Sequence, residues 1–194
     1  KVIFYPIPYQ IPDDVYAKLL DWVKAGGALY VSGDVSYDMF RRRTLTNRLE
    51  ELCGVEFLAA RYPNIACDPN KGLPATIDGR ELTVNPAITV KPTSGQVVSA
   101  ANDEGKTPVV IRNDLGEGRV IFSTWPLERD EGFADGIAER NAWVYVTVLG
   151  AAGFDDWPPE GAAGPQLPVS VPLVGRRAHA HLYVNPTERK VAPW

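Results

Sequence analysis

Four side chains that follow predicted strands are the best placed in this chain for chemistry. Asp34 and Asp38 come just after an apolar run at 28–32, and Trp125 and Glu128 come just after another at 119–124. An open α/β sheet binds its ligands beyond the carboxyl ends of its strands. Asp34 and Glu128 are therefore the candidate catalytic acid and base, and Asp34, Asp38 and Trp125 the candidate ligand-binding residues. Because the spacing does not bring the carboxylates together, we favour the simpler interpretation that they cap turns or face solvent.

Nucleophilic and metal chemistry find little support in the sequence. The segment 32–36 lacks the Gly-x-Ser-x-Gly pattern that presents a nucleophile on a strand–helix turn. Cys53 lies among leucines, which predicts a thiol in the core, and Cys67 has no neighbour that would lower its pKa. His179 and His181 share one face of a predicted strand, but no third metal ligand is suggested. With no phosphate-binding glycine loop either, we expect no metal and no cofactor.

Two further groups of residues are compatible with ligand binding, but each has a simpler interpretation that we favour. The basic triplet at 41–43 suits an anion, although a solvated loop or a partner-facing patch is the favoured interpretation. Aromatic faces stack on sugar rings, but core packing is the favoured role of the tryptophans. The tryptophans concerned are Trp22, Trp125, Trp143 and Trp157.

Composition excludes several classes of protein. The 194 residues carry 20 Lys and Arg against 24 Asp and Glu, a net charge of −4, so the basic surface of a nucleic-acid-binding protein is missing. No apolar run is long enough to span a membrane, and two cysteines make no disulfide framework. We expect a globular protein without nucleic-acid or membrane partners, and favour a cytoplasmic location. Apolar segments close to Lys1 and Trp194 favour a piece of a longer polypeptide.

The first part of the chain predicts a strand–helix–strand unit. The apolar run at 2–5 is typical of a strand buried on both faces. Acidic residues after Pro12, apolar residues at helical spacing and Gly26-Gly27 predict a helix between Pro12 and Gly26. The run at 28–32 is the second strand. Such a unit of about 30 residues makes its two strands parallel.

The remainder predicts shorter elements and an α/β fold. In chain order these are a loop at 34–43, a short helix ending at Gly54, extended chain at 55–58, an irregular segment at 62–74, antiparallel strands within 75–101 with turns at 78–79 and 94–95, a hairpin over 108–124, a helix at 135–149, a linker at 158–168, and strands at 169–174 and 180–184. The sheet is expected to be flavodoxin-like and mostly parallel, with an antiparallel excursion. We expect an α/β domain at 1–157, and at 169–194 the start of a β-domain.

Several segments resemble the middle domain of multidomain β-galactosidase-type glycoside hydrolases, and they occur in the family's order. In the family, a strand followed by a proline leads to a helix that ends in V-x-A-G-G-x-L-x-V. The similar segments here are Val2-Ile-Phe-Tyr-Pro6 and then Leu19-Leu-Asp-Trp-Val-Lys-Ala-Gly-Gly-Ala-Leu-Tyr-Val31. Later matches are Leu49-Glu-Glu-Leu-Cys-Gly-Val55, the hairpin Gly116-Glu-Gly-Arg-Val-Ile-Phe122 and Leu182-Tyr-Val-Asn-Pro-Thr187. The resemblance implies a class I glutamine-amidotransferase-like fold, often used in the family for trimerisation.

The resemblance also implies that this chain is not catalytic by itself. The paired glutamates of the family lie on a (β/α)8 barrel that this chain lacks, and the Cys-His-Glu triad of amidotransferases is missing, with Asp34 near the nucleophile's place. We expect an accessory or oligomerisation domain whose partners are the catalytic barrel of the same parent chain and further copies of that parent. The alternatives are a free-standing module that binds a carbohydrate or another small ligand near Asp34 and Trp125, and a small hydrolase using Asp34 and Glu128.

Overall fold

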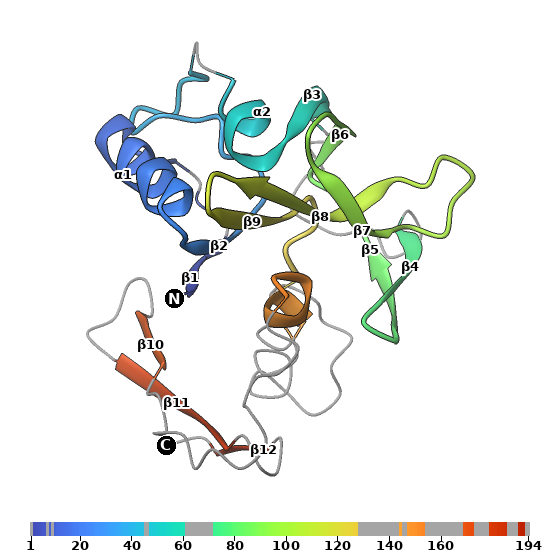
Figure 1. Cartoon of the computed structure of the whole chain (residues 1–194). Helices are drawn as coiled ribbons and strands as arrows, with labels where there is room; N and C mark the ends of the chain where they lie inside the picture. The colour runs from blue at the N-terminus through green and yellow to red at the C-terminus, as the bar shows by residue number, and fades with distance from the viewer. Residues whose placement is uncertain are drawn as a thin grey trace. The chain divides into compact units, whose positions relative to one another are not determined.

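The computed structural model divides the chain into two compact units, Lys1–Asp130 and Glu131–Trp194 (Figure 1). Residues described with their side chains are 2–6, 8, 10–44, 47–59, 72–127, 144 and 147–153. Backbone alone is described for 60, 169–172, 179–185 and 190–192. Each unit is described by itself.

The first unit opens with the predicted strand–helix–strand motif. It consists of β1 (Val2–Tyr5), α1 (Asp13–Lys24) and β2 (Ala28–Ser32). Asp13 and Asp14 occupy the first turn of α1, where the helix dipole favours negative charge. β1 pairs with β2 in parallel, as predicted. β1 is the edge strand of its sheet and its Ile3 is 37% exposed, so the expected burial on both faces is not found.

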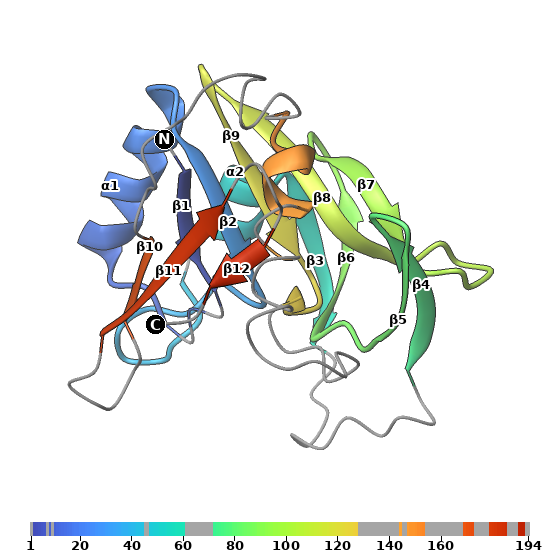
Figure 2. The same cartoon turned by 90° about the horizontal axis from the view of Figure 1, so that it is seen from below.

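Three further strands complete a mixed five-stranded sheet in the order β1-β2-β9-β8-β7 (Figure 2). They are β7 (Gln96–Ala100), β8 (Pro108–Leu115) and β9 (Gly118–Ser123). β9 runs parallel to β2, whereas β8 is antiparallel to both β9 and β7. The predicted hairpin is thus confirmed, and its turn contacts the end of α1: Glu117 N–H donates to the Lys24 carbonyl over 3.0 Å. A Cβ at Gly116 would come within 2.5 Å of that carbonyl oxygen, so the turn needs glycine there.

A short helix and four strands make up the rest of the described first unit. They are α2 (Arg48–Cys53), β3 (Val55–Ala60), β4 (Leu73–Ile77), β5 (Arg80–Val84) and β6 (Ile88–Pro92). β4 and β5 form a hairpin with its turn at the predicted place, and β3 pairs antiparallel with β6. Gly54 ends α2 in the left-handed conformation at φ 68°, as glycine at this position commonly does.

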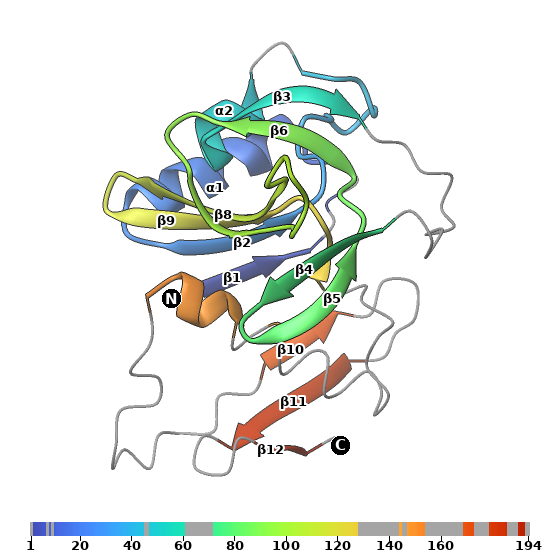
Figure 3. The same cartoon turned by 90° about the vertical axis from the view of Figure 1, so that its right-hand side faces the viewer.

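One large buried apolar cluster of the first unit lies on one face of the main sheet. Figure 3 shows α1, α2, β3 and β6 together on that side of the sheet. Leu20 and Val23 of α1, Leu52 and Cys53 of α2 and Phe122 of β9 belong to one buried apolar cluster. Cys53 is fully buried, and burial raises the pKa of its thiol far above the ordinary value. The predicted core thiol is confirmed.

The described part of the second unit holds helical backbone at 144 and 147–151 and a three-stranded antiparallel sheet. The strands are β10 (Val169–Pro172), β11 (His179–Asn185) and β12 (Lys190–Ala192). β10 and β11 are the two predicted strands, and the sequence interpretation missed β12. Most of the helix expected at 135–149 and the whole linker expected at 158–168 lie outside the described residues. No helix in the described part of the chain is long and apolar enough to cross a membrane.

Candidate functional site

The loop that follows β2 is folded into a small hairpin. Tyr37 and Arg43 form an antiparallel bridge, and Asp38 N–H donates to the Arg42 carbonyl over 2.9 Å. Arg41, at the tip, has a φ of 58°, which is uncommon for a residue with a side chain. The loop predicted at 34–43 is therefore held in a defined shape by its own backbone.

Asp38 anchors this hairpin with its side chain. Its Oδ1 accepts the backbone N–H groups of Phe40 and Arg42, over 2.8 and 2.9 Å. Its Oδ2 accepts Nε and Nη2 of Arg42, over 3.0 and 2.8 Å, which makes a two-pronged ion pair. The Arg42 backbone N–H is the main reason that the pKa of Asp38 lies below its usual value, and the other donors outweigh the opposing effect of burial. Asp38 is thus an ionised anchor.

Asp34 has a similar role at the base of the hairpin. Its Oδ1 accepts the Ser36 N–H over 2.9 Å, which closes a turn of the kind that Asp commonly forms, and its Oδ2 accepts Nη2 of Arg43 over 3.0 Å. The guanidinium of Arg43 also lies over the rings of Tyr37 and Phe57, 5.1 and 4.2 Å from their centroids. Asp34 and Asp38 therefore pair with different arginines and are not arranged as an acid–base couple.

Arg48 connects the hairpin to both helices from a position that is 2% exposed. Its Nη1 donates to the carbonyl oxygens of Ile11 and Tyr37, over 2.8 and 3.3 Å. Its Nη2 donates to Asp13 at the start of α1, and its Cζ lies 4.5 Å from the centroid of the Tyr16 ring. One buried cation therefore fixes two loops and two helices relative to one another.

The sequence interpretation did not identify Arg48. The available signal was its place in α2, four residues before Leu52, because positions i and i+4 of a helix share a face. Arg48 stands on the face that buries Leu52 and is itself buried there. A charged residue on the apolar face of a short helix needs partners, so the position should have drawn attention.

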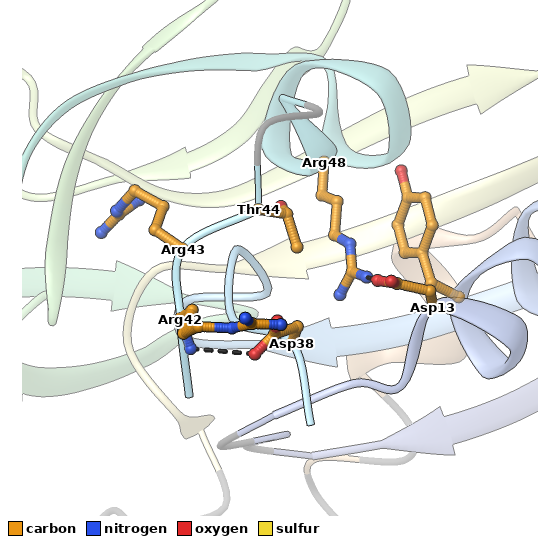
Figure 4. A pocket seen from close by; sticks show the side chains of 7 residues that line it. Asp13, Asp38, Arg42, Arg43, Thr44 and Arg48 are labelled. Carbon is orange, nitrogen blue, oxygen red and sulfur yellow. Dashed lines mark hydrogen bonds and ion pairs between the residues drawn. The ribbon is translucent and has the colours of Figure 1, made fainter. Parts of the chain in front are cut away.

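An open pocket of about 570 Å³ lies between the hairpin and the two helices (Figure 4). Its lining residues are Asp13, Tyr16, Asp38, Arg42, Arg43, Thr44 and Arg48. In Figure 4 the guanidinium of Arg48 meets Asp13, and Arg42 and Asp38 meet each other. The pocket is lined mainly by charged groups that are already paired.

Of the three predicted ligand-binding residues, only Asp38 is among the described residues that line this pocket. Gly33 N–H donates to the Ser123 carbonyl over 3.0 Å, so the ends of β2 and β9 do meet at one edge of the sheet, as expected. Asp34 and Trp125 follow these ends. Trp125 is only 8% exposed, and no described residue accepts a hydrogen bond from its indole N–H. Glu128, the second candidate for acid–base work, lies outside the described residues.

The described residues also bear on the other candidate sites. Among them, no group of three or more His, Cys, Asp or Glu could hold a metal ion. Trp22 packs against the core, in line with the packing role favoured for the tryptophans, whereas Trp143 and Trp157 lie outside the described part. Of the basic triplet, Arg42 and Arg43 have carboxylate partners in the hairpin itself.

No family model matches the chain, and no curated protein sequence matches it. Several solved structures do match the chain. A β-galactosidase from Bacillus circulans sp. alkalophilus matches 95% of this chain with 25% of its own, at 13% identity and a TM-score of 0.60. Gan42B, a GH42 β-galactosidase from G. stearothermophilus, matches 63% of this chain with 18% of its own, at 21% identity and a TM-score of 0.52. The exo-β-1,4-mannosidase Op5Man5 from an Opitutaceae bacterium matches 75% of this chain with 25% of its own, at 18% identity and a TM-score of 0.53.

These likenesses describe the fold. The chain spans a quarter or less of the length of these three solved proteins, and the identities lie between 13% and 21%. This chain thus shares the fold of a part of each of these glycoside hydrolases.

Proposed function

We propose that this chain is a non-catalytic accessory domain of a glycoside hydrolase that acts on β-galactoside-like carbohydrates. The observation that carries the proposal is the likeness of 95% of the chain to a quarter of a β-galactosidase, at a TM-score of 0.60. A matched part of that size leaves three quarters of the larger protein for the catalytic centre. Fold alone does not imply activity, so the site has to support the role as well.

The chemistry of the site agrees with a role that is not catalytic. A retaining or inverting glycosidase needs two carboxyl groups that flank the scissile bond, and the one that protonates the leaving group needs a pKa near the working pH. Asp38 is instead held ionised by Arg42 and by backbone N–H groups, and Asp34 is bound by Arg43 and Ser36. Both carboxylates serve the hairpin.

The finer proposal is a class I amidotransferase-like, flavodoxin-like domain from the middle of its parent. The β1–α1–β2 unit with parallel β9 supports it, together with the A-G-G-A-L-Y-V segment that joins α1 to β2. Its partners are then the catalytic barrel of the same parent chain and further copies of that parent.

Activity measurements test the proposal. The 194-residue chain should not hydrolyse p-nitrophenyl β-D-galactopyranoside, whereas the full-length parent should hydrolyse it and should contain a (β/α)8 barrel. Turnover by the chain alone that disappears in Asp34→Asn or Glu128→Gln would establish the small-hydrolase alternative and overturn the accessory role. A full-length protein without a separate catalytic domain would overturn it too.

A further inference from the structure

The pocket between the hairpin and the two helices has the size and lining of a binding site for a small polar molecule. Its volume of about 570 Å³ falls in the usual range of small-molecule sites. Arg48 and Tyr16 are buried among its lining residues, while the side chains of Asp13 and Arg42 are 83% and 71% exposed. Polar groups therefore run from buried positions in the pocket out to solvent.

The arginines of this pocket are already paired with carboxylates, which favours a neutral ligand over an anion. The three arginines of the lining each have a carboxylate partner: Arg42 pairs with Asp38, Arg43 with Asp34, and Arg48 with Asp13. An anion would gain little from cations that are already neutralised, and it would lie beside the carboxylates as well. A neutral molecule pays no such penalty.

The paired groups present donors and acceptors in fixed positions. A guanidinium has five N–H donors and a carboxylate has about four acceptor positions, so a pair that shares two hydrogen bonds keeps others for a ligand. Asp38 has no such position left, because Phe40 N–H, Arg42 N–H and the Arg42 side chain use all four. Among the described contacts, Arg42 keeps its Nη1 donors and Asp13 keeps Oδ2, since only its Oδ1 accepts from Arg48. Arg43 is held over two rings and Arg48 by two carbonyls, so little conformational freedom remains to be lost when a ligand binds.

We propose that this pocket binds a neutral carbohydrate through adjacent hydroxyl groups. Each hydroxyl both donates and accepts a hydrogen bond, so neighbouring hydroxyls can accept from the guanidinium of Arg42 and donate to the carboxylate of Asp13, both of which line the pocket. Of the three predicted ligand-binding residues, Asp34 and Trp125 are not among its described lining residues, whereas Asp38 is. It does not depend on the proposed accessory role, because a chain of any function with this pocket should bind the sugar.

Titration by NMR tests the proposal on the 194-residue chain. Methyl β-D-galactopyranoside should shift the backbone amides of Asp13, Arg42 and Thr44 saturably, with a Kd on the order of 1 mM, as expected for a ligand of about 13 heavy atoms. Methyl β-D-mannopyranoside, inorganic phosphate and galacturonate are titrated in parallel. Saturation by either neutral sugar supports the proposal. It is overturned if neither sugar shifts these amides at about ten times that concentration, or if phosphate or galacturonate binds more tightly than both sugars.

Two pairs of variants locate the binding. Asp13→Asn and Arg42→Met should each weaken sugar binding about fivefold, since each removes part of one hydrogen-bonding group. Their controls are Asp14→Asn, an exposed neighbour paired with Lys18, and Arg112→Met, whose ion pair lies outside the pocket. The controls should stay within about twofold of the unchanged chain. Equal losses in a variant and its control would place the binding elsewhere and overturn the assignment.

Discussion

Replacing Arg48 with methionine should destabilise the first unit by about 2–3 kcal/mol. Met keeps an apolar stem but loses the guanidinium, so the Ile11 carbonyl loses a donor at 2.8 Å, which is worth about 2 kcal/mol for a charged group. The stacking over Tyr16 at 4.5 Å is worth about 1 kcal/mol more. The Tyr37 carbonyl also accepts the Ile11 N–H, so losing its second donor, Arg48, adds little to the cost. With a urea m-value of about 2 kcal/mol/M, the midpoint followed by circular dichroism should fall by about 1 M.

Asp13→Asn tests the carboxylate of the Arg48–Asp13 ion pair separately from the guanidinium. The Asp13 side chain is 83% exposed, and Asn keeps an oxygen that can accept from Arg48, but the buried guanidinium loses its charge partner. The replacement should therefore cost about 1 kcal/mol, less than Arg48→Met. Arg48→Lys keeps the charge but not the fork that reaches two carbonyls, so its midpoint should fall between those of Arg48→Met and the unchanged chain. If Arg48→Met and Asp13→Asn have the same midpoint, or if Arg48→Lys is as stable as the unchanged chain, the argument for a buried hub is refuted.

Two other predictions concern backbone strain and pH. Gly54→Ala should cost at least about 2 kcal/mol, since φ is 68° and its Cβ would lie 2.5 Å from Gly95 N and 2.6 Å from Asn113 Oδ1. Gly33→Ala, at φ 80° with nothing within 4 Å of its Cβ, should cost about 1 kcal/mol. Equal urea midpoints for the two variants would contradict this. Asp38 has a lowered pKa in the folded chain, so its ionised form adds stability above the ordinary value of 3.8 and loses that contribution as pH falls through the folded value. The Tm difference between Asp38→Asn and the unchanged chain should therefore be largest above about pH 5 and shrink below about pH 3; a difference that does not vary with pH would rule this account out.

Local signals predicted the parts of the fold that local interactions make. Apolar runs on either side of a helix that ends at Gly26-Gly27 gave the β1–α1–β2 unit, and the turn at 113–118 gave the β8–β9 hairpin. The predicted turn at Ser94-Gly95 exists too, but it does not join a hairpin. There the N–H groups of Thr93 and Gly95 both donate to the Gly54 carbonyl, over 2.8 and 3.0 Å, so the chain passes from the pair β3–β6 into the main sheet. That path depends on a residue about 40 positions away, which no local pattern contains.

The candidate site was predicted less well for a similar reason. The loop after β2 was predicted to lie at the carboxyl edge of the sheet, and the parallel ends of β2 and β9 confirm that position. The partners of the nearby Arg48 were not predictable, because two of its acceptors are the backbone carbonyls of Ile11 and Tyr37, which are present whatever side chains stand there. The ion pair between Asp38 and Arg42 has the spacing of a helical pair but occurs in a hairpin, where spacing says little about contact.

The position after β2 shows why a strand-end loop alone is a poor indicator of catalysis. A reactive group needs a perturbed pKa in the direction of its task and a free path to a substrate. The shift of Asp38 is in the opposite direction, since donors from Arg42 and Phe40 stabilise its charged form and make it a weaker base. The same donors hold the hairpin in one shape, which is the property that a binding surface needs. The chemistry of this loop therefore favours holding a partner or a ligand over transforming one.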